Sequence, residues 1–248
     1  LHVSFGSRQL FTVGDEYKYN YEVLITTGTE EPVSHAASYR LKGVLRVQGT
    51  AQNRVTVKLE DVGIGLFNGQ WSYFPVPSVN YLPLEELNSL SEPFQIVSEN
   101  GKFKTLLMND QEPEWASNMK KGLATYLQMN LERVSPQKLM FFKDEESTTM
   151  GICPTMYEVM PATATGMGLA RVSKFRNHAD CPDVPSRIRH ESRTYYRCND
   201  DRTRDIMNST SYSIYDLSVQ DTSITVQKVT VLSSILFWAN DSKRTFLV

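Results

Sequence analysis

Three cysteines and four histidines are the residues of this chain best suited to chemistry. The cysteines are Cys153, Cys181 and Cys198, and no two of them have the Cys-x-x-Cys spacing of structural zinc sites. The histidines are His2, His35, His178 and His190, and none belongs to a His-Glu-x-x-His helix motif. A nucleophile elbow and a phosphate-binding glycine loop are also missing from the sequence. We therefore expect no catalytic residues, no metal site and no cofactor, and the protein is not expected to be an enzyme.

Two other patterns resemble catalytic motifs only superficially. Gly166 and Gly168 form a glycine pair without the third glycine and the strand-to-helix setting of a dinucleotide loop, so we interpret them as a turn. Glu145 and Glu146 are adjacent carboxylates, and we interpret them as part of a charged, solvated loop. Neither pattern argues for catalysis.

The cysteines and two sequence triplets bear on the compartment. A disulfide between Cys153 and Cys181 would close a strand-turn-strand segment. The chain-entropy model of disulfides predicts that such a bond stabilises the folded state by about 3–4 kcal/mol. The alternative is a pair of buried free thiols in a cytosolic protein. Asn208 and Asn240 begin Asn-x-Ser/Thr triplets, which are glycosylation acceptors and favour the secreted alternative.

Charge is balanced over the chain but concentrated locally. The formal net charge is −2, so no global field draws the chain to nucleic acid or to an anionic membrane. A short basic segment stands out, consisting of Arg171, Lys174, Arg176 and His178. In an extended strand the last three share a face and Arg171 lies opposite. Two roles remain open for this segment: contact with an acidic partner, or protection of an edge strand against aggregation.

No membrane or targeting segment is expected. The sequence contains no run of 18 apolar residues, so we expect no transmembrane segment. The start of the chain lacks the apolar core of a signal peptide, so the chain is interpreted as mature or cytosolic.

Alternating apolar and polar residues predict β-strands in most of the chain. The first strands are expected at residues 17–23, 39–47 and 55–59, with a hairpin turn between the last two. Gly63 and Gly65 predict a bulge or a close approach of another backbone segment, and the prolines of residues 75–92 predict an irregular crossing loop. Asn100-Gly101 predicts a tight hairpin. Further strands are expected at residues 157–160, 170–175, 193–197, 212–219 and 224–232.

Residues 112–131 change to a helical period. Trp115, Met119, Leu123 and Leu127 recur every four residues and predict one buried stripe. Lys120 falls elsewhere on the helical wheel. Gly122 weakens such a helix unless it allows a strand to pack closely. Since no repeat or linker interrupts the pattern, we expect residues 1–248 to form one mainly β domain with one long α-helix.

The chain resembles the vitellogenins, apolipophorins and microsomal triglyceride transfer protein, which are large lipid transfer proteins. The resemblance rests on residues 11–21 (FTVGDEYKYNY), 81–103, 114–122 (EWASNMKKG) and 151–159 (GICPTMYEV) with the later Cys181. These segments follow one another in the order that the family shows, and they are most similar to arthropod vitellogenin. Family members often carry another cysteine near Cys198, whereas Asn199, Asp200 and Asp201 follow here.

The resemblance implies a strongly curved, barrel-like antiparallel sheet wrapped around a central helix of about residues 112–131. It implies a Cys153–Cys181 disulfide in a secreted lipoprotein of haemolymph or plasma that is later stored in egg yolk. Lipid cargo would be held by downstream domains that this chain lacks. The family's receptor-binding segment corresponds to residues 171–178, so Arg171, Lys174, Arg176 and His178 are the expected contacts for a receptor of the low-density-lipoprotein receptor family. Such receptors present calcium-ordered carboxylates, which suit lysine and arginine.

Two other functions of the same family remain open. One is a haemolymph clotting or immune lipoprotein that binds clot components or microbial surfaces. The other is an interaction subunit similar to microsomal triglyceride transfer protein.

Overall fold

A computed structural model describes residues 9–29, 35–70, 87–149, 151–166, 168–182, 206–220, 223–239 and 242–247. Within these residues, eleven strands form one sheet in the order β5-β4-β3-β2-β1-β11-β10-β9-β8-β7-β6, with every neighbouring pair antiparallel. The strands are β1 (Glu16–Thr29), β2 (His35–Ala51), β3 (Arg54–Gln70), β4 (Phe94–Glu99), β5 (Lys102–Leu107), β6 (Met140–Thr148), β7 (Gly151–Met160), β8 (Ala170–Asn177), β9 (Ile206–Gln220), β10 (Ser223–Ala239) and β11 (Ser242–Leu247). The mainly β fold expected from the sequence is therefore confirmed.

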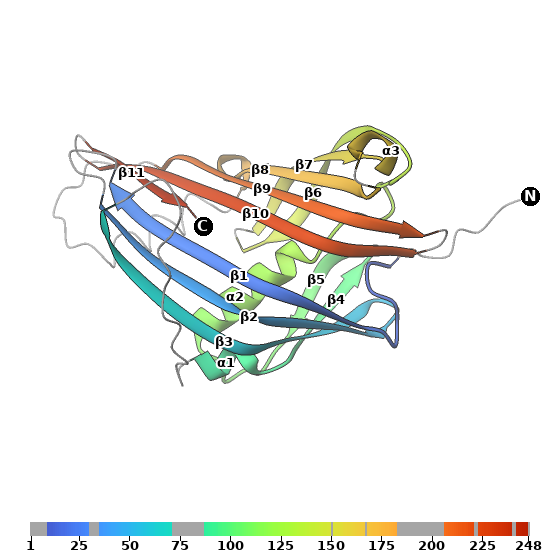
Figure 1. Cartoon of the computed structure of the whole chain (residues 1–248), viewed down its shortest axis with the longest axis horizontal. Helices are drawn as coiled ribbons and strands as arrows, with labels where there is room; N and C mark the ends of the chain where they lie inside the picture. The colour runs from blue at the N-terminus through green and yellow to red at the C-terminus, as the bar shows by residue number, and fades with distance from the viewer. Residues whose placement is uncertain are drawn as a thin grey trace, which may run out of the picture.

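The sheet curves strongly but does not close into a barrel. Its two edge strands, β5 and β6, lie near one another without forming a ladder of hydrogen bonds. Helix α2 (Glu114–Tyr126) contacts both edge strands and lies inside the curve of the sheet (Figure 1). The expectation of a nearly closed barrel is thus corrected to an open, curved sheet.

Alternation of side chains sets the two faces of the first long strands. Tyr17, Tyr19 and Tyr21 pack against the core, whereas Lys18 and Asn20 between them are exposed. Because successive side chains of a strand point to opposite faces, the aromatic residues cover the interior and the polar ones meet solvent. The three predicted strands at the start of the chain are confirmed, and all are longer than their alternating cores.

The predicted bulge and the predicted tight hairpin are both present. Asp61 has φ 52°, and the β2–β3 register shifts beside it, two residues before Gly63. Asn100 and Gly101 have φ values of 51° and 80°, as a two-residue hairpin of the primed type requires. A Cβ atom on Gly101 would lie 2.2 Å from the Met129 carbonyl oxygen, so only glycine fits this position.

Helix α2 is shorter than residues 112–131. The chain leaves the helix after Tyr126 and runs along the β4–β5 hairpin, where Met129 N donates to Gly101 O at 2.9 Å and Leu131 N donates to Asn100 O at 3.0 Å. Met129 and Leu131 thus donate to the hairpin and not to the preceding helical turn. Two further helices, α1 (Asn88–Ser91) and α3 (Ala162–Thr165), have one turn each.

The buried stripe of α2 is rotated from the predicted one. Trp115 is 41% exposed, whereas Ala116, Lys120, Leu123 and Ala124 are buried. The Lys120 ammonium is tolerated there because it donates to the Glu92 carbonyl oxygen at 2.8 Å and to the Glu112 carboxylate. Lys120 therefore belongs to the interior and not to the solvent face.

Replacing Gly122 with alanine should stabilise the domain. No atom lies within 4 Å of the Cβ that alanine would add, so the alternative of close strand packing is wrong. Alanine should raise the free energy of unfolding by about 0.5–1 kcal/mol, because it loses less backbone entropy than glycine when it enters a helix. Urea unfolding of the two proteins measures the difference, and an equal or lower midpoint for the variant would contradict it.

Several expectations fall wholly or partly outside the described residues. These are the strand at residues 193–197 and most of the crossing loop at residues 75–92, of which only the end is described, as α1. Gly166 and Gly168 both have positive φ and lie in the predicted turn after α3. Among the described residues, no helix is long and apolar enough to cross a membrane.

Candidate functional site

Strand β8 carries three of the four predicted receptor contacts, and it divides them between its two faces. Lys174 and Arg176 point to the inner face with Ala170 and Val172, and they are 1% and 3% exposed. Arg171 lies on the outer face, where its Nε donates to the Asp216 carboxylate of β9 at 2.8 Å. The predicted shared face of Lys174 and Arg176 is confirmed, but it is the face that the core covers.

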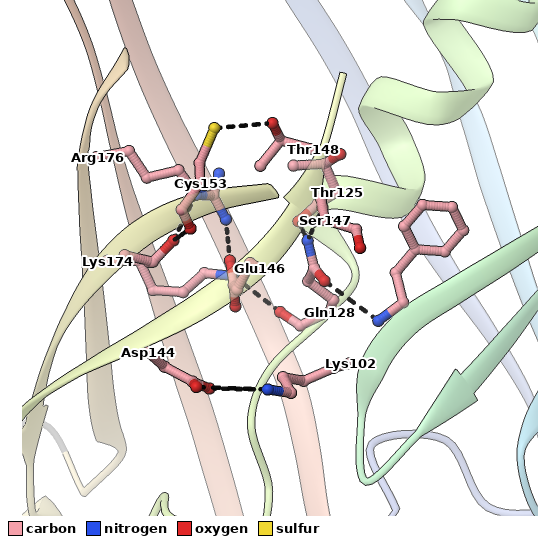
Figure 2. Close-up of polar contacts among 12 residues, drawn as sticks. Lys102, Thr125, Gln128, Asp144, Glu146, Ser147, Thr148, Cys153, Lys174 and Arg176 are labelled. Atoms are coloured by element: carbon pink, nitrogen blue, oxygen red, sulfur yellow. Dashed lines mark hydrogen bonds and ion pairs between the residues drawn. The ribbon is translucent and has the colours of Figure 1, made fainter. Parts of the chain in front are cut away.

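Glu146 of β6 is the counter-ion of both buried cations. The Lys174 ammonium nitrogen lies 3.2 Å from each Glu146 carboxylate oxygen, and the Arg176 guanidinium donates to Oε2. Figure 2 shows the three side chains converging from β6 and β8. Glu146 is itself 1% exposed, so the interpretation of Glu145 and Glu146 as a solvated pair is wrong for Glu146.

Neutral groups complete this ionic cluster, which we define as Glu146, Tyr157, Lys174, Arg176 and Tyr215. The Tyr157 hydroxyl donates to Glu146, and Lys174 lies 4.8 Å from the centre of the Tyr215 ring. Arg176 Nε donates to the Thr155 hydroxyl at 2.8 Å. Buried charged groups need these hydrogen bonds and ion pairs, because an unpaired charge in the interior strongly destabilises the folded state.

Burial and charge act against one another in the cluster. Burial would raise the pKa of Glu146, but the charges of Lys174 and Arg176 and the hydrogen bond from Tyr157 hold that pKa below its usual value. Burial, opposed by Glu146, lowers the pKa of Lys174 to about 8. Burial and the Glu146 charge raise the pKa of Tyr157. At neutral pH the cluster therefore holds two cations, one carboxylate and two neutral phenols.

The cluster fixes the segment that follows α2. Lys174 Nζ donates to the Gln128 carbonyl oxygen at 2.9 Å, and the Gln128 side chain accepts from Phe103 N at 3.1 Å and donates to Ser147 O at 2.7 Å. One glutamine thus joins β5 to β6 across the gap between the two edge strands (Figure 2). Gln128, which Lys174 of the ionic cluster holds in place, thus supplies side-chain contacts between two edge strands that no ladder joins.

A second polar bridge lies beside the first. The Lys102 ammonium of β5 lies 3.3 Å from a carboxylate oxygen of Asp144 in β6, and Asn130 donates to the same carboxylate. Hydrogen bonds from Asn130 and Glu145, together with Lys102, lower the pKa of Asp144 against the opposing effect of burial. This bridge also connects the two edges of the sheet.

Cys153 of β7 and Cys181 are paired in a disulfide with a Cα–Cα separation of 4.6 Å. The disulfide lies beside the ionic cluster, because Thr155, two residues after Cys153, accepts the hydrogen bond from Arg176. Cys198 lies outside the described residues, as does Asn240, and the side chain of Asn208 is likewise not described.

The structure thus corrects the receptor-contact prediction. Lys174 and Arg176 cannot meet a partner in this conformation because their charged groups are bonded inside the core. His178 is half-buried, and burial together with the Arg176 charge lowers its pKa, so it is neutral at physiological pH. Arg171 is partly exposed, and its charge is paired with that of Asp216.

The outer face of the same strands carries a feature that the sequence analysis missed. Met156, Phe175, Tyr212 and Leu232 are directly opposite one another across β7, β8, β9 and β10, and we call them the outer apolar row. They are 48%, 43%, 38% and 57% exposed. Lys143, which is also exposed, pairs with Met156 at one end of the row. Only the strand register brings these residues together.

The chemically reactive side chains near β8 are already engaged with one another. The charged groups of the ionic cluster are all bonded within a closed interior. No group of three or more potential metal ligands occurs among the residues that the structure describes. The outer apolar row, with Lys143 at its end, is the exposed apolar feature of this part of the sheet.

Fold and site together define a class of protein: a domain built on one antiparallel sheet that curves around a helix and a buried ionic cluster. The model of the vitellogenin N-terminal domain family matches residues 11–245, and the chain belongs to this family.

Individual relatives agree with this assignment. Vitellogenin-2 of Periplaneta americana is 25% identical over 215 residues, covering 76% of this chain and 11% of the relative. Hemolymph clottable protein of Penaeus monodon is 26% identical over 162 residues, covering 62% of this chain and 10% of the relative. The solved structure "Lipid-protein interactions in lipovitellin" matches 96% of this chain and 25% of its own with a TM-score of 0.70 at 18% identity, which shows the shared fold. The chain thus spans about a tenth of the length of these curated relatives.

Proposed function

We propose that this chain is the amino-terminal recognition domain of a secreted lipid-transport lipoprotein, a yolk precursor, and that it binds an endocytic receptor of the low-density-lipoprotein receptor family. Membership of the vitellogenin N-terminal domain family supports the first part. The disulfide and the two glycosylation acceptors are consistent with haemolymph or plasma and later egg yolk. Lipid cargo would be held by parts of the polypeptide beyond this domain.

The outer apolar row is the observation that carries the receptor proposal. It lies on the strand that the family resemblance implicates, but on the opposite face from Lys174 and Arg176. A contiguous exposed apolar patch on a sheet is typical of an interaction site. Lys143 at the end of the row would supply the charge for an acidic receptor module.

In this arrangement the buried basic residues act indirectly. Lys174 and Arg176 hold β8 against β6 through Glu146, and this keeps Phe175, the residue between them, directed outward. Substitution of either cation would therefore reduce receptor binding by disturbing the strand and not by removing a contact.

Phe175→Ala should weaken binding to a receptor ectodomain by at least about tenfold, because a central aromatic residue contributes much of the binding energy of an interface. Surface plasmon resonance on the immobilised ectodomain, with calcium at physiological salt, measures this affinity. Leu66→Ala is the matched control, since Leu66 is 72% exposed on β3, away from the row. Lys143→Ala should slow association and reduce its dependence on salt. Unchanged affinity of a folded Phe175→Ala protein would remove the proposed surface.

A clotting role is the second candidate, and the likeness to Hemolymph clottable protein favours it. The same exposed row would then contact other clot components. Binding of the chain to haemolymph proteins, lost in Phe175→Ala, with no binding to the receptor ectodomain, would favour this role over endocytosis.

A further inference from the structure

A cavity of about 470 Å³ lies where two hairpins meet the carboxyl end of α2. The β2–β3 turn contributes Asn53 and Arg54, and the β4–β5 hairpin contributes Ser98 and Asn100. The volume is within the range of about 300–1,000 Å³ that small-molecule sites occupy. Neither the ionic cluster nor the outer apolar row belongs to this cavity.

The lining of the cavity is divided by polarity. Its apolar lining comes from four separate parts of the chain and includes Leu10, Phe11, Val55, Ile96, Phe103 and Leu127. Leu10, Phe11 and Ile96 are buried, and the other three are partly buried, so apolar surface extends from the core to the opening. Such a lining favours a hydrocarbon chain because water gains no hydrogen bonds there.

Most polar residues lie at the more exposed part of the lining, and the side chain of the buried Gln128 is already bonded to Phe103 and Ser147. Arg54 is exposed, and its guanidinium has no bonded partner among the residues that the structure describes. Glu132 also lines the cavity, but it accepts a hydrogen bond from the Asn100 side chain. Arg54 is therefore the cation that remains available to an anionic head group.

We propose that this cavity binds a single acyl chain whose head group presents carboxylate or phosphate oxygens to Arg54. The apolar lining would take the hydrocarbon, and the guanidinium would make charge-assisted hydrogen bonds to the head. A fatty acid and a lysophospholipid share this chemistry. The inference goes beyond receptor recognition, because the cavity uses β2–β5 and α2, whereas the outer apolar row uses β7–β10.

Isothermal titration of the 248-residue chain with laurate, and separately with lauroyl lysophosphatidylcholine, tests the proposal below the micellar concentration of each lipid. Saturable binding of at least one lipid is expected. Ser98→Phe should weaken it by at least about tenfold, because the larger side chain occupies space needed by the acyl chain. Arg54→Gln should weaken it by at least about fivefold through loss of the charged donor.

Lys104→Gln is the matched control, because Lys104 is 60% exposed on β5 and does not line the cavity. Its affinity should remain within about twofold of that of the wild type, since a distant surface charge contributes little. Binding of laurate alone identifies a fatty-acid site, and binding of both lipids identifies the shared chemistry; each supports the proposal.

Two outcomes would overturn it. One is a lack of saturable binding by the wild-type chain at up to about 1 mM lipid, beyond which an affinity is too weak to be specific. The other is equal binding by wild type and Arg54→Gln, which tests the site even where Ser98→Phe does not fold. Both results are independent of receptor binding, which Phe175→Ala tests.

Discussion

Glu146→Ala is expected to destabilise the domain by about 3–5 kcal/mol, because it leaves two buried cations without their counter-ion. Lys174 and Arg176 are both within the core, and Glu146 is the carboxylate that contacts them. The variant must therefore either solvate the cations by opening the β6–β8 region or deprotonate Lys174, whose pKa is already lowered by burial. Urea unfolding followed by tyrosine fluorescence measures the loss.

Glu145→Ala is the matched control for this prediction. It removes a carboxylate from the adjacent position of β6, whose side chain is exposed, so its effect should be below about 0.5 kcal/mol. A change of similar size in both variants would contradict a special role for Glu146.

A triple variant separates charge balance from packing. Replacing Glu146, Lys174 and Arg176 together with Leu, Met and Met removes every charge of the ion pairs and keeps much of their volume. Such exchanges of complete buried ion pairs are often neutral or stabilising. We therefore expect the triple variant to be more stable than Glu146→Ala alone, and a further loss would show that hydrogen bonds to Gln128 and Thr155 dominate.

Local pattern was sufficient for the elements of the fold. The alternation of Tyr17, Tyr19 and Tyr21 fixed both a strand and its buried face, because a strand's period is a property of the strand alone. Asn100-Gly101 predicted its hairpin for the same reason, since the φ values of two residues define that turn. Element type and turn chemistry are local, and the chain supplies them directly.

The ionic cluster and the outer apolar row could not be predicted in this way. Glu146 contacts cations that follow it by 28 and 30 residues, and its burial depends on which face of β6 turns inward. The two-residue period of a strand predicted that Lys174 and Arg176 share a face. It did not predict which face is buried, because apolar residues occur on both: Val172 on the lysine face and Phe175 on the other. Only the register of β6, β7 and β8 decides between the core and solvent.

The error at α2 has a similar cause. Spacing placed Leu127 in a helical stripe, and residues 127–131 contain no glycine or proline that would end a helix. The helix ends at Tyr126 because the following residues form better bonds with the β4–β5 hairpin, which is distant in sequence from that end. Tertiary hydrogen bonds therefore overrode a local preference.

Loss of the disulfide through Cys153→Ala with Cys181→Ala is expected to cost about 3–4 kcal/mol, since the bond closes a loop of 28 residues that is otherwise free in the unfolded chain. The bond also joins β7 to the end of β8, so its loss should loosen the strand that holds Lys174 and Arg176 inside and Phe175 outside.

Urea unfolding of the double variant measures the cost, and the reduced wild type is the matched comparison. Both should show the same loss, and dithiothreitol should cause no further change in the double variant. A loss below about 1 kcal/mol would contradict the entropic account. It would show instead that the ionic cluster and the core hold β8 in place without covalent help, and receptor binding would then be insensitive to reduction.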